Sequence, residues 1–468
     1  MTAPAIRRRS NFAMESAQKA RANSLQTGFD SNPFLGIEWS PAYLAFAAYT
    51  FAIITYRFPI GTASMSVALL ALPLEKQALR FPAVAALAMA LVAWSLVGLA
   101  STSYPKVVTD HVSEFAKVCA VTFVAVNVIV TRARFRAFIV GSIILFFLFP
   151  VRGTLLAFFV YHGDVAGRAA WNYIYSNPND LAALCLLQLS VAIGILATER
   201  KKWVVLGTRV TIGLLVLIIV LTQSRGAIIA LGVFAVIGGR RFLRNRTAVL
   251  SILGLAVFIY LAAPSSAWRR FSTISTATQR EDLDPDLMDL QTRQDQGSSQ
   301  QRLAIWGVAT TVIAENPLVG VGLGAYPDAH YAVSLRPGSD WIARGHRDTH
   351  STYLNLMAET GLVGFGLWAT MIFLTLRTSR RARKTMEARA PALSVQLFHM
   401  EVGLYAYLVA GIWGSYGEAV PTFVHLVLMY VGARLLVEQG GNTAPRLRSG
   451  PARAYSPAAV AHHDGASA

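Results

Sequence analysis

The sequence predicts an all-α polytopic membrane protein with about twelve transmembrane helices, and three observations support this fold class. The 468 residues are 54% hydrophobic and only 14% charged, with a mean hydropathy of +0.46. This composition is too apolar for an ordinary soluble chain of the same length. Long apolar runs recur along the chain, and basic residues gather in every second connector between them. We therefore expect the chain to fold in a bilayer.

The candidate spans follow from run length, since a helix that crosses a bilayer needs about 20 mostly apolar residues. The second and eighth runs are shorter, so these two segments can instead be tilted or re-entrant. The ninth and tenth runs are separated by a long polar interval. The twelve runs are 41–57, 62–74, 82–100, 113–131, 137–156, 180–198, 203–222, 226–239, 247–263, 352–376, 396–415 and 420–437.

The orientation follows from Lys and Arg, which accumulate in the cytoplasmic loops of membrane proteins. The connectors after the second, fourth, sixth, eighth and tenth spans together hold 18 Lys and Arg residues. The short loops on the other side hold Arg57, Lys106 and Arg168. Both termini and the five basic connectors are therefore expected in the cytoplasm.

The same alternation divides the chain into five segments. Residues 1–39 form a basic cytoplasmic arm and residues 438–468 a cytoplasmic tail, and both have compositions typical of disorder. Spans one to nine occupy residues 40–263, and spans ten to twelve occupy residues 351–437. Residues 264–350 become one large, partly helical loop on the outer side, and loops of this length usually carry function.

Charge and cysteine content exclude two classes of protein. The net charge of +17 is compatible with a nucleic-acid partner, but such a partner requires Lys and Arg on one folded soluble face. Here the basic residues lie in connectors beside apolar runs, where membrane lipid is the expected partner. The two cysteines, Cys119 and Cys185, fall inside apolar runs, so a disulfide framework and a cysteine metal site both lack ligands.

Two arginines near the outer boundary are candidates for binding an anion. Arg225 lies between two apolar runs, where a guanidinium must snorkel, form an ion pair or meet an anionic ligand. Arg302 is expected in the first turn of an amphipathic helix over 301–314, which the Asn-Pro pair at 316–317 ends. The free N–H groups of such a turn, together with Arg302, suit a phosphate or diphosphate. Lipid snorkelling for Arg225 and simple solvation for Arg302 remain as alternatives.

A polar cluster at the mouth of the tenth span holds candidates for acid–base chemistry. The segment GHRDTHS contains His346, Asp348 and His350 directly before the apolar run. A neutral histidine there can accept a proton from a hydroxyl group near neutral pH. The three side chains are also zinc-ligand types, and alternation would place them on one side of an extended segment. A distant ligand cluster that would match them is not visible, and a solvated loop is the third interpretation.

We interpret several other polar segments mainly as structural features. The glycines of 320–324 are not a dinucleotide fingerprint, because no strand precedes them, and we expect a flexible turn. The acidic run 281–295 is typical of a solvated segment. Glu359 and Glu401 fall in or near spans, where a carboxylate indicates a proton path or helix packing. Before the sixth span, the NPND segment at 177–180 is expected to form an N-cap led by its last two residues.

The order of these segments resembles the O-antigen ligase/polymerase family of bacterial envelope proteins. The matching pieces are NPNDLA before a middle span, QSRGA between spans, R-x-x-x-W from Arg302 to Trp306 followed by NPLVGVGLG, and HSTYLNLxAETGLVG from His350. They cover roughly residues 170–370, and the long loop lies between the ninth and tenth spans. The resemblance depends on their order and spacing more than on any single fragment.

The resemblance implies a GT-C-like, metal-independent glycosyltransferase of the bacterial cell inner membrane, with its active face in the periplasm and no cofactor. It would move a glycan from undecaprenyl diphosphate to an acceptor hydroxyl. By motif, Arg225 and Arg302 would bind the diphosphate, and His350 would be the catalytic residue that orients or deprotonates the acceptor. The secondary candidates are Arg168, His346, Tyr353 and Glu359, of which His346 matches no family role.

The family contains ligases, which pass a finished chain to lipid A-core, and polymerases, which extend a growing lipid-linked polysaccharide. Other relatives glycosylate proteins or build exopolysaccharide. We expect a ligase-type enzyme of lipopolysaccharide or surface polysaccharide biosynthesis, with a polymerase as the second interpretation. A non-enzymatic carrier or flippase of lipid-linked sugars is the alternative from another class. A carrier needs basic residues along a central path, whereas the distinctive residues here lie on the outer side.

Overall fold

The computed structural model describes residues 31–56, 58–239 and 290–442, together with a few single residues between 250 and 268. Regular structure in this part of the chain is helical, apart from one isolated bridge between Val165 and Arg168. Seven helices there are long and apolar enough to cross a membrane, which confirms the all-α membrane fold class. They are α5 (Pro105–Val128), the run Arg132–Phe159 made of α6, η2 and α7, α8 (Pro178–Thr198), α9 (Lys202–Leu221), α15 (Thr352–Met386), α16 (Pro391–Ala410) and α17 (Val420–Asn442).

Shorter apolar helices account for four more of the predicted spans. They are α2 (Pro41–Thr55), α3 (Gly61–Leu70), α4 (Ala83–Gly98) and α10 (Arg225–Gly239). Eleven of the twelve predicted spans thus coincide with helices, while the ninth, 247–263, falls largely outside the described residues. The total of twelve stays a prediction.

Two helices are longer than their hydropathy predicts. α5 begins at Pro105, well before the predicted start at residue 113, because proline suits the first turn of a helix although the residues after it are polar. α15 continues to Met386, past the predicted end at residue 376, and carries basic residues in its last turn. Hydropathy detects only the apolar part of each helix.

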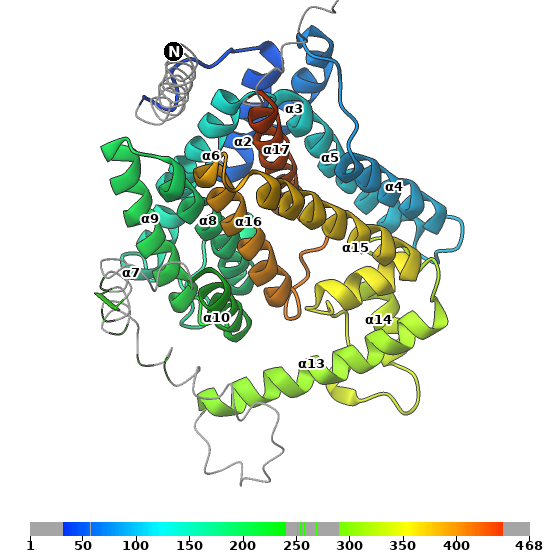
Figure 1. Cartoon of the computed structure of the whole chain (residues 1–468). Helices are drawn as coiled ribbons and strands as arrows, with labels where there is room; N and C mark the ends of the chain where they lie inside the picture. The colour runs from blue at the N-terminus through cyan, green and yellow to red at the C-terminus, as the bar shows by residue number, and fades with distance from the viewer. Residues whose placement is uncertain are drawn as a thin grey trace, which may run out of the picture.

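The helices α8 and α16 lie side by side in the middle of the molecule (Figure 1). Every residue from Leu181 to Leu187 of α8 is buried, as expected for an apolar helix that other helices surround. α8 and α16 also begin or end at the loops that carry the polar residues discussed below. The central pair therefore fixes where those loops lie.

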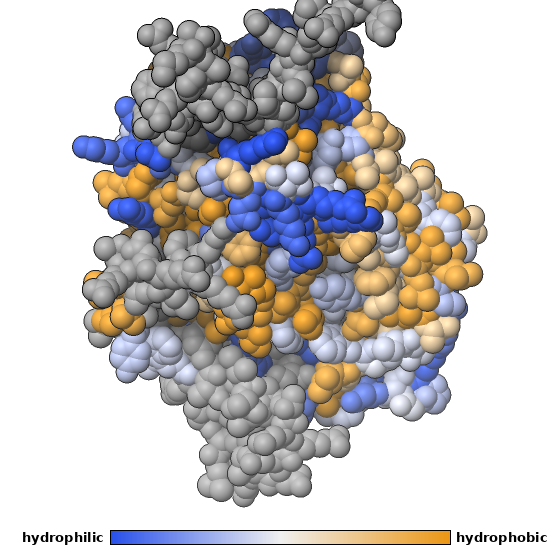
Figure 2. Space-filling view, in the orientation of Figure 1, coloured by the Kyte–Doolittle hydropathy of each residue, from blue (hydrophilic) through white to orange (hydrophobic). Residues whose placement is uncertain are grey.

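The flank of the helix bundle exposes large apolar side chains. Leu70, Val236 and Phe373 are 80%, 64% and 60% exposed. Figure 2 shows hydrophobic side chains over much of the visible face, interrupted by groups of hydrophilic ones. Such a surface suits contact with lipid chains.

The described part of the large loop is partly helical. α13 (Leu290–Glu315) crosses one end of the molecule, and α14 (Tyr326–Ser334) lies beside it (Figure 1). Ala309 and Val312 of α13 pack with Tyr326 of α14 in one small buried cluster. Residues 271–289, which include most of the acidic run, lie outside the described residues.

The glycines of 320–324 form a packed turn, so the expectation of a flexible one was wrong. The N–H of Gly322 donates to the Glu359 carbonyl oxygen at 2.9 Å. Gly320 has φ +76°, and a Cβ there would lie 2.4 Å from the Glu359 carbonyl carbon. α15 bends at Gly361, whose φ is +66°, and receives this turn. Only glycine allows two backbones to meet so closely.

The structure describes only the inner part of the expected arm and tail, and there the chain has contacts or is helical. Residues 31–39 contact α6, where Arg136 Nη2 donates to the Ser31 carbonyl and Arg134 Nε to the Glu38 carbonyl, both at 2.8 Å. Buried guanidinium groups need such acceptors, which explains why this segment is held. α17 reaches Asn442, beyond the predicted end at 437. The rest of the arm and tail, 1–30 and 443–468, lies outside the described residues.

Candidate active site

Three arginines that are far apart in the sequence line one small pocket. Arg168 comes from the loop before α8, Arg225 from the start of α10, and Arg302 from α13. The other residues that line it are polar, small or aromatic: Asn179, Gln223, Ser224, Gly226 and Trp413. This lining contains three guanidinium groups and, among the residues that the structure describes, no carboxylate. Its chemistry favours an anion over a metal cation.

Two hydrogen bonds help to fix Arg168 at the wall of the pocket. Its Nε donates to the carbonyl oxygen of Thr222, and its Nη2 donates to Oδ1 of Asn179, both at 2.8 Å. The N–H of Ala169 adds a bond of 2.9 Å to the Leu221 carbonyl. The loop before α8 is thereby bound to the end of α9.

The turn between α9 and α10 places Arg225. Gln223 adopts φ +51°, and its Nε2 donates to the Gly167 carbonyl at 2.9 Å. Arg225 is the first residue of α10, so its side chain emerges where the helix N-terminus offers backbone N–H groups. The next residue, Gly226, packs on the ring of Trp413, where an added Cβ would lie 2.8 Å from the indole. Trp413 thus closes the pocket against α10.

Arg302 lies in the body of α13, so its expected position in a first turn was wrong. α13 begins at Leu290 instead of near Gln301. Residues 290–300 have no apolar period in the sequence, which explains why the earlier start was not predicted. Arg302 therefore lines the pocket from the body of a helix and not from a helix N-terminus. One turn further on, Trp306 Nε1 donates to the Thr349 carbonyl at 2.9 Å and ties α13 to the segment that holds His350.

His350 faces a carboxylate at the mouth of α15. Its Nδ1 lies 3.4 Å from Oδ2 of Asp348, and Ser415 Oγ donates to both oxygens of that carboxylate at 3.0 and 3.1 Å. The backbone of His350 has φ +49°, a strained conformation that costs about 1–3 kcal/mol in a residue other than glycine and often occurs at functional sites.

Three charges and burial set the basicity of His350. Burial lowers the pKa of the imidazole, Asp348 raises it, and the positive charges of Arg302 and Arg347 lower it, with a net decrease from its usual value. The ring is therefore neutral at neutral pH and can accept a proton. The hydrogen bond from Trp306 to the residue before His350 brings the helix of Arg302 next to the segment of His350.

The two histidines have separate partners. His346 Nδ1 lies 3.3 Å from Asp328, and its ring stacks on Tyr331 with centroids 4.3 Å apart. His346 therefore faces α14, while His350 faces Asp348. Among the described residues, no group of three or more His, Cys, Asp or Glu side chains is arranged to hold a metal ion.

The loop between α16 and α17 contributes residues that the sequence analysis did not single out. Thr352 N–H donates to the Gly411 carbonyl at 2.8 Å, and its Oγ1 donates to the Gly414 carbonyl at 2.7 Å. Trp413 and Ser415 lie in the same loop and meet the arginine pocket and Asp348. The sequence GIWGSYGE, with glycines and aromatic residues between two spans, is the signal that could have indicated it.

The remaining candidates have positions outside the arginine pocket. Tyr353 Oη donates to the Leu408 carbonyl at 2.6 Å and joins α15 to α16. Glu359 is buried, and its Oε1 accepts the N–H of Tyr326 at 3.4 Å. The N-cap of α8 is Asn177, whose side chain accepts the N–H of Asn179, so the expected cap was wrong by two or three residues. Asn179 is thereby left to bind Arg168.

A family model described as O-antigen ligase matches residues 210–369. The matched stretch contains Arg225, Arg302 and His350, while Arg168 and the loop between α16 and α17 lie outside it. A search of curated proteins finds no match to this chain.

Proposed function

We propose, on the premise that this chain belongs to the O-antigen ligase/polymerase family, that it transfers a glycan from undecaprenyl diphosphate to an acceptor hydroxyl. The reaction takes place at the periplasmic face of the bacterial inner membrane, and both termini lie in the cytoplasm. One observation carries this proposal: three arginines line one pocket, and the hydrogen bond of Trp306 ties the helix of Arg302 to the segment in which His350 faces Asp348.

The arginines bind the donor. Arg225 and Arg302 hold the diphosphate through charge-assisted hydrogen bonds, and Arg168 is the third guanidinium in the same pocket. When the bond between the anomeric carbon and the diphosphate oxygen breaks, negative charge develops on the leaving group. Fixed guanidinium groups stabilise that charge, and for this reason the proposed reaction requires no metal ion.

His350 is the general base. The acceptor oxygen forms a bond to the anomeric carbon, its proton passes to the imidazole, and the diphosphate leaves with the bonding electrons. Asp348 faces Nδ1, so Nε2 is the nitrogen that meets the hydroxyl, and Asp348 stabilises the imidazolium that forms. The distance of 3.4 Å is compatible with a contact that shortens when substrate binds.

The identity of the acceptor decides whether the proposed enzyme is a ligase or a polymerase. A ligase uses lipid A-core as the acceptor, and a polymerase uses a growing lipid-linked polysaccharide as the acceptor. Both reactions form a glycosidic bond to a hydroxyl and release undecaprenyl diphosphate, so the same residues serve either one. We take the ligase as the first assignment and the polymerase as the second.

The test is a transfer assay with purified protein, undecaprenyl-diphosphate glycan, and either lipid A-core or a second lipid-linked repeat. We expect a product that forms in EDTA and is lost in His350→Ala. Arg344→Ala is the control, since this exposed arginine does not line the pocket. The acceptor that is consumed distinguishes ligase from polymerase. Absence of product with both acceptors, while liposomes show movement of the lipid-linked glycan across the bilayer, would contradict the enzyme and favour a carrier.

A further inference from the structure

The segment that carries Asp348 and His350 has no helix or strand of its own. Residues 344–350 lie between the short helix η5 (Trp341–Ala343) and the start of α15. Gly345, near the beginning of the segment, has φ +112°, and glycine adopts many backbone conformations at little cost. The orientation of the segment therefore depends on contacts from neighbouring elements.

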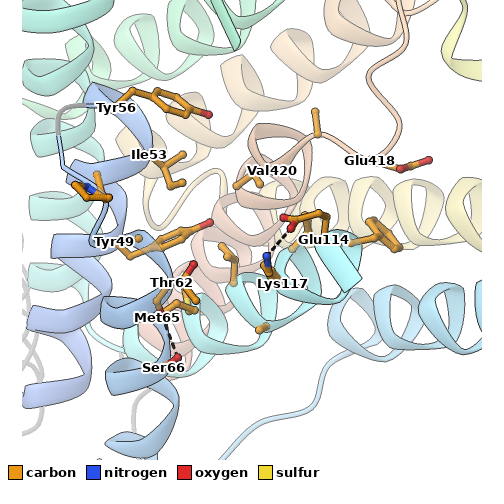
Figure 3. A pocket seen from close by; sticks show the side chains of 18 of the residues that line it. Tyr49, Ile53, Tyr56, Thr62, Met65, Ser66, Glu114, Lys117, Glu418 and Val420 are labelled. Carbon is orange, nitrogen blue, oxygen red and sulfur yellow. Dashed lines mark hydrogen bonds and ion pairs between the residues drawn. The ribbon is translucent and has the colours of Figure 1, made fainter. Parts of the chain in front are cut away.

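A large cavity on the other side of the molecule does not include this segment. The helices α2, α3 and α5 enclose about 900 Å³, and the ion pair of Glu114 with Lys117 forms part of the wall (Figure 3). Glu418, from the loop between α16 and α17, reaches this wall, but none of the described residues 344–350 does. An occupant of this cavity would not contact the segment, so the support of the segment comes from the protein's own side chains.

α14 supplies a buried hydrogen bond to Gly345. His330 of α14 is fully buried, and its ring lies beside that of Tyr326 with the centroids 5.5 Å apart. Its Nδ1 lies 2.9 Å from the Gly345 carbonyl oxygen. Because a carbonyl oxygen only accepts, Nδ1 carries the proton. At the other end of the segment, Trp306 of α13 donates to the Thr349 carbonyl. The two bonds hold the segment at both ends.

The ring of His330 is neutral at neutral pH. Burial lowers the pKa of the imidazole, the hydrogen bond to Gly345 raises it, and the positive charges of Arg347 and then His346 lower it, with a net decrease from its usual value. Nε2 of His330 is buried and has no hydrogen-bond partner among the described residues. A proton there would form a buried N–H group without an acceptor, which is unfavourable. The polar part of this side chain therefore makes one contact, with Gly345.

A second contact between α14 and the segment lies in water. His346 contacts Asp328 and stacks on Tyr331, but its side chain is 57% exposed. Water can replace an exposed contact of this kind, whereas a fully buried donor has no such substitute. His330 is therefore the residue of α14 on which the position of the segment depends most.

We propose that His330 is a positioning residue for the transfer reaction, which acts through the Gly345 carbonyl and keeps Asp348 and His350 where the acceptor hydroxyl meets the anomeric carbon. His330 itself contacts neither substrate. This inference rests on the proposed function and adds to it a residue that supports the acid–base pair from outside the pocket. A displacement of about 1 Å at a reacting group can lower a rate by about 100-fold, so a single supporting bond can have a large effect.

The test removes the Nδ1 donor and then restores it. His330→Phe keeps a ring without a donor and should lower kcat by about 10-fold or more, with the KM for undecaprenyl-diphosphate glycan within about 2-fold of wild type. His330→Asn places an amide N–H near the position of Nδ1 and should keep kcat within about 3-fold of wild type. His330→Gln carries the amide one methylene further and should lose activity as His330→Phe does. If His330→Phe does not fold, the comparison of His330→Asn with His330→Gln decides the same question.

The control is Ser334→Ala, because Ser334 is fully buried on the same helix and its Oγ donates to the Tyr331 carbonyl within α14. Its kcat and KM should stay within about 2-fold of wild type. General disruption of α14 would also move α13, since Val333 and Val312 pack in one cluster, and would raise the KM for the glycan through Arg302. A rise in this KM as large as the fall in kcat, or equal losses in His330→Asn and His330→Phe, would overturn the inference.

Hydrogen–deuterium exchange separates this inference from the proposed function, because it needs no turnover. In His330→Phe and His330→Gln, a peptide over 344–351 should exchange faster than in wild type, whereas a peptide over 301–314, which contains Arg302, should not. Unchanged exchange of 344–351 overturns the positioning role even if the wild-type protein is an active transferase. Faster exchange there in a protein that transfers no glycan supports the hold of His330 on the segment and counts against the proposed function alone.

Discussion

Replacing Arg302 by glutamine removes a positive charge that binds the donor in the proposed mechanism and that lowers the pKa of His350. A charge-assisted hydrogen bond contributes about 1.5–3 kcal/mol, so loss of one bond to the diphosphate should lower kcat/KM by about 10- to 150-fold. Arg302 also lowers the pKa of His350. Without it, that pKa rises. Because the base must be neutral, the acidic limb of the pH–rate profile should then move to higher pH.

The matched variant is Arg225→Gln. Arg225 lines the same pocket, but the charges that shift the pKa of His350 come from Asp348, Arg302 and Arg347. We therefore expect a comparable loss of kcat/KM with a smaller movement of the acidic limb. The assay is the initial rate of transfer between pH 5 and pH 9. Equal shifts in the two variants, or a shift of Arg302→Gln to lower pH, would refute the link between Arg302 and His350.

Three further predictions concern neighbours of the site. Asp348→Asn should lower kcat by about 100-fold, because the imidazolium of His350 loses its carboxylate. The control is Asp328→Asn, since Asp328 contacts His346. An equal loss of kcat in the control would contradict the pairing of His350 with Asp348. His346→Ala should change kcat by less than about 3-fold, and a loss as deep as that of His350→Ala would show that the wrong histidine was chosen. Gly226→Ala places a Cβ 2.8 Å from Trp413 and should destabilise the protein by about 1–3 kcal/mol. Gly232→Ala, on the same helix with open space around it, should not lower the melting temperature in detergent, and equal melting temperatures for the two variants would argue against the close packing.

The helices were predictable because lipid imposes one simple requirement. Each span must be long and apolar, and this pattern can be read directly along the chain. The helix ends were less predictable, as α13 shows, since its first residues have no apolar period and carry no start signal. The kink of α15 at Gly361 depends on the close approach of residues from another segment. Such contacts are not visible in local sequence.

The site was predicted in part for the same reason. Arg225 and Arg302 could be singled out because charged groups at a membrane boundary need a partner or a role, and His350 because a neutral histidine can accept a proton. Their common location depends on loops far apart in the chain, and so does the contribution of Trp413 and Ser415. The difference between His346 and His350 appears only when each ring meets its own aspartate. The alternation of side chains in an extended segment would have placed both histidines on the same side of it.

The most direct test of the central claim is an experimental structure of the His350→Ala protein with undecaprenyl-diphosphate glycan. The account predicts that phosphate oxygens lie within hydrogen-bond distance of Arg225 and Arg302, with the anomeric carbon on the side of residue 350. A diphosphate bound away from both arginines, or an anomeric carbon that faces away from residue 350, would contradict it.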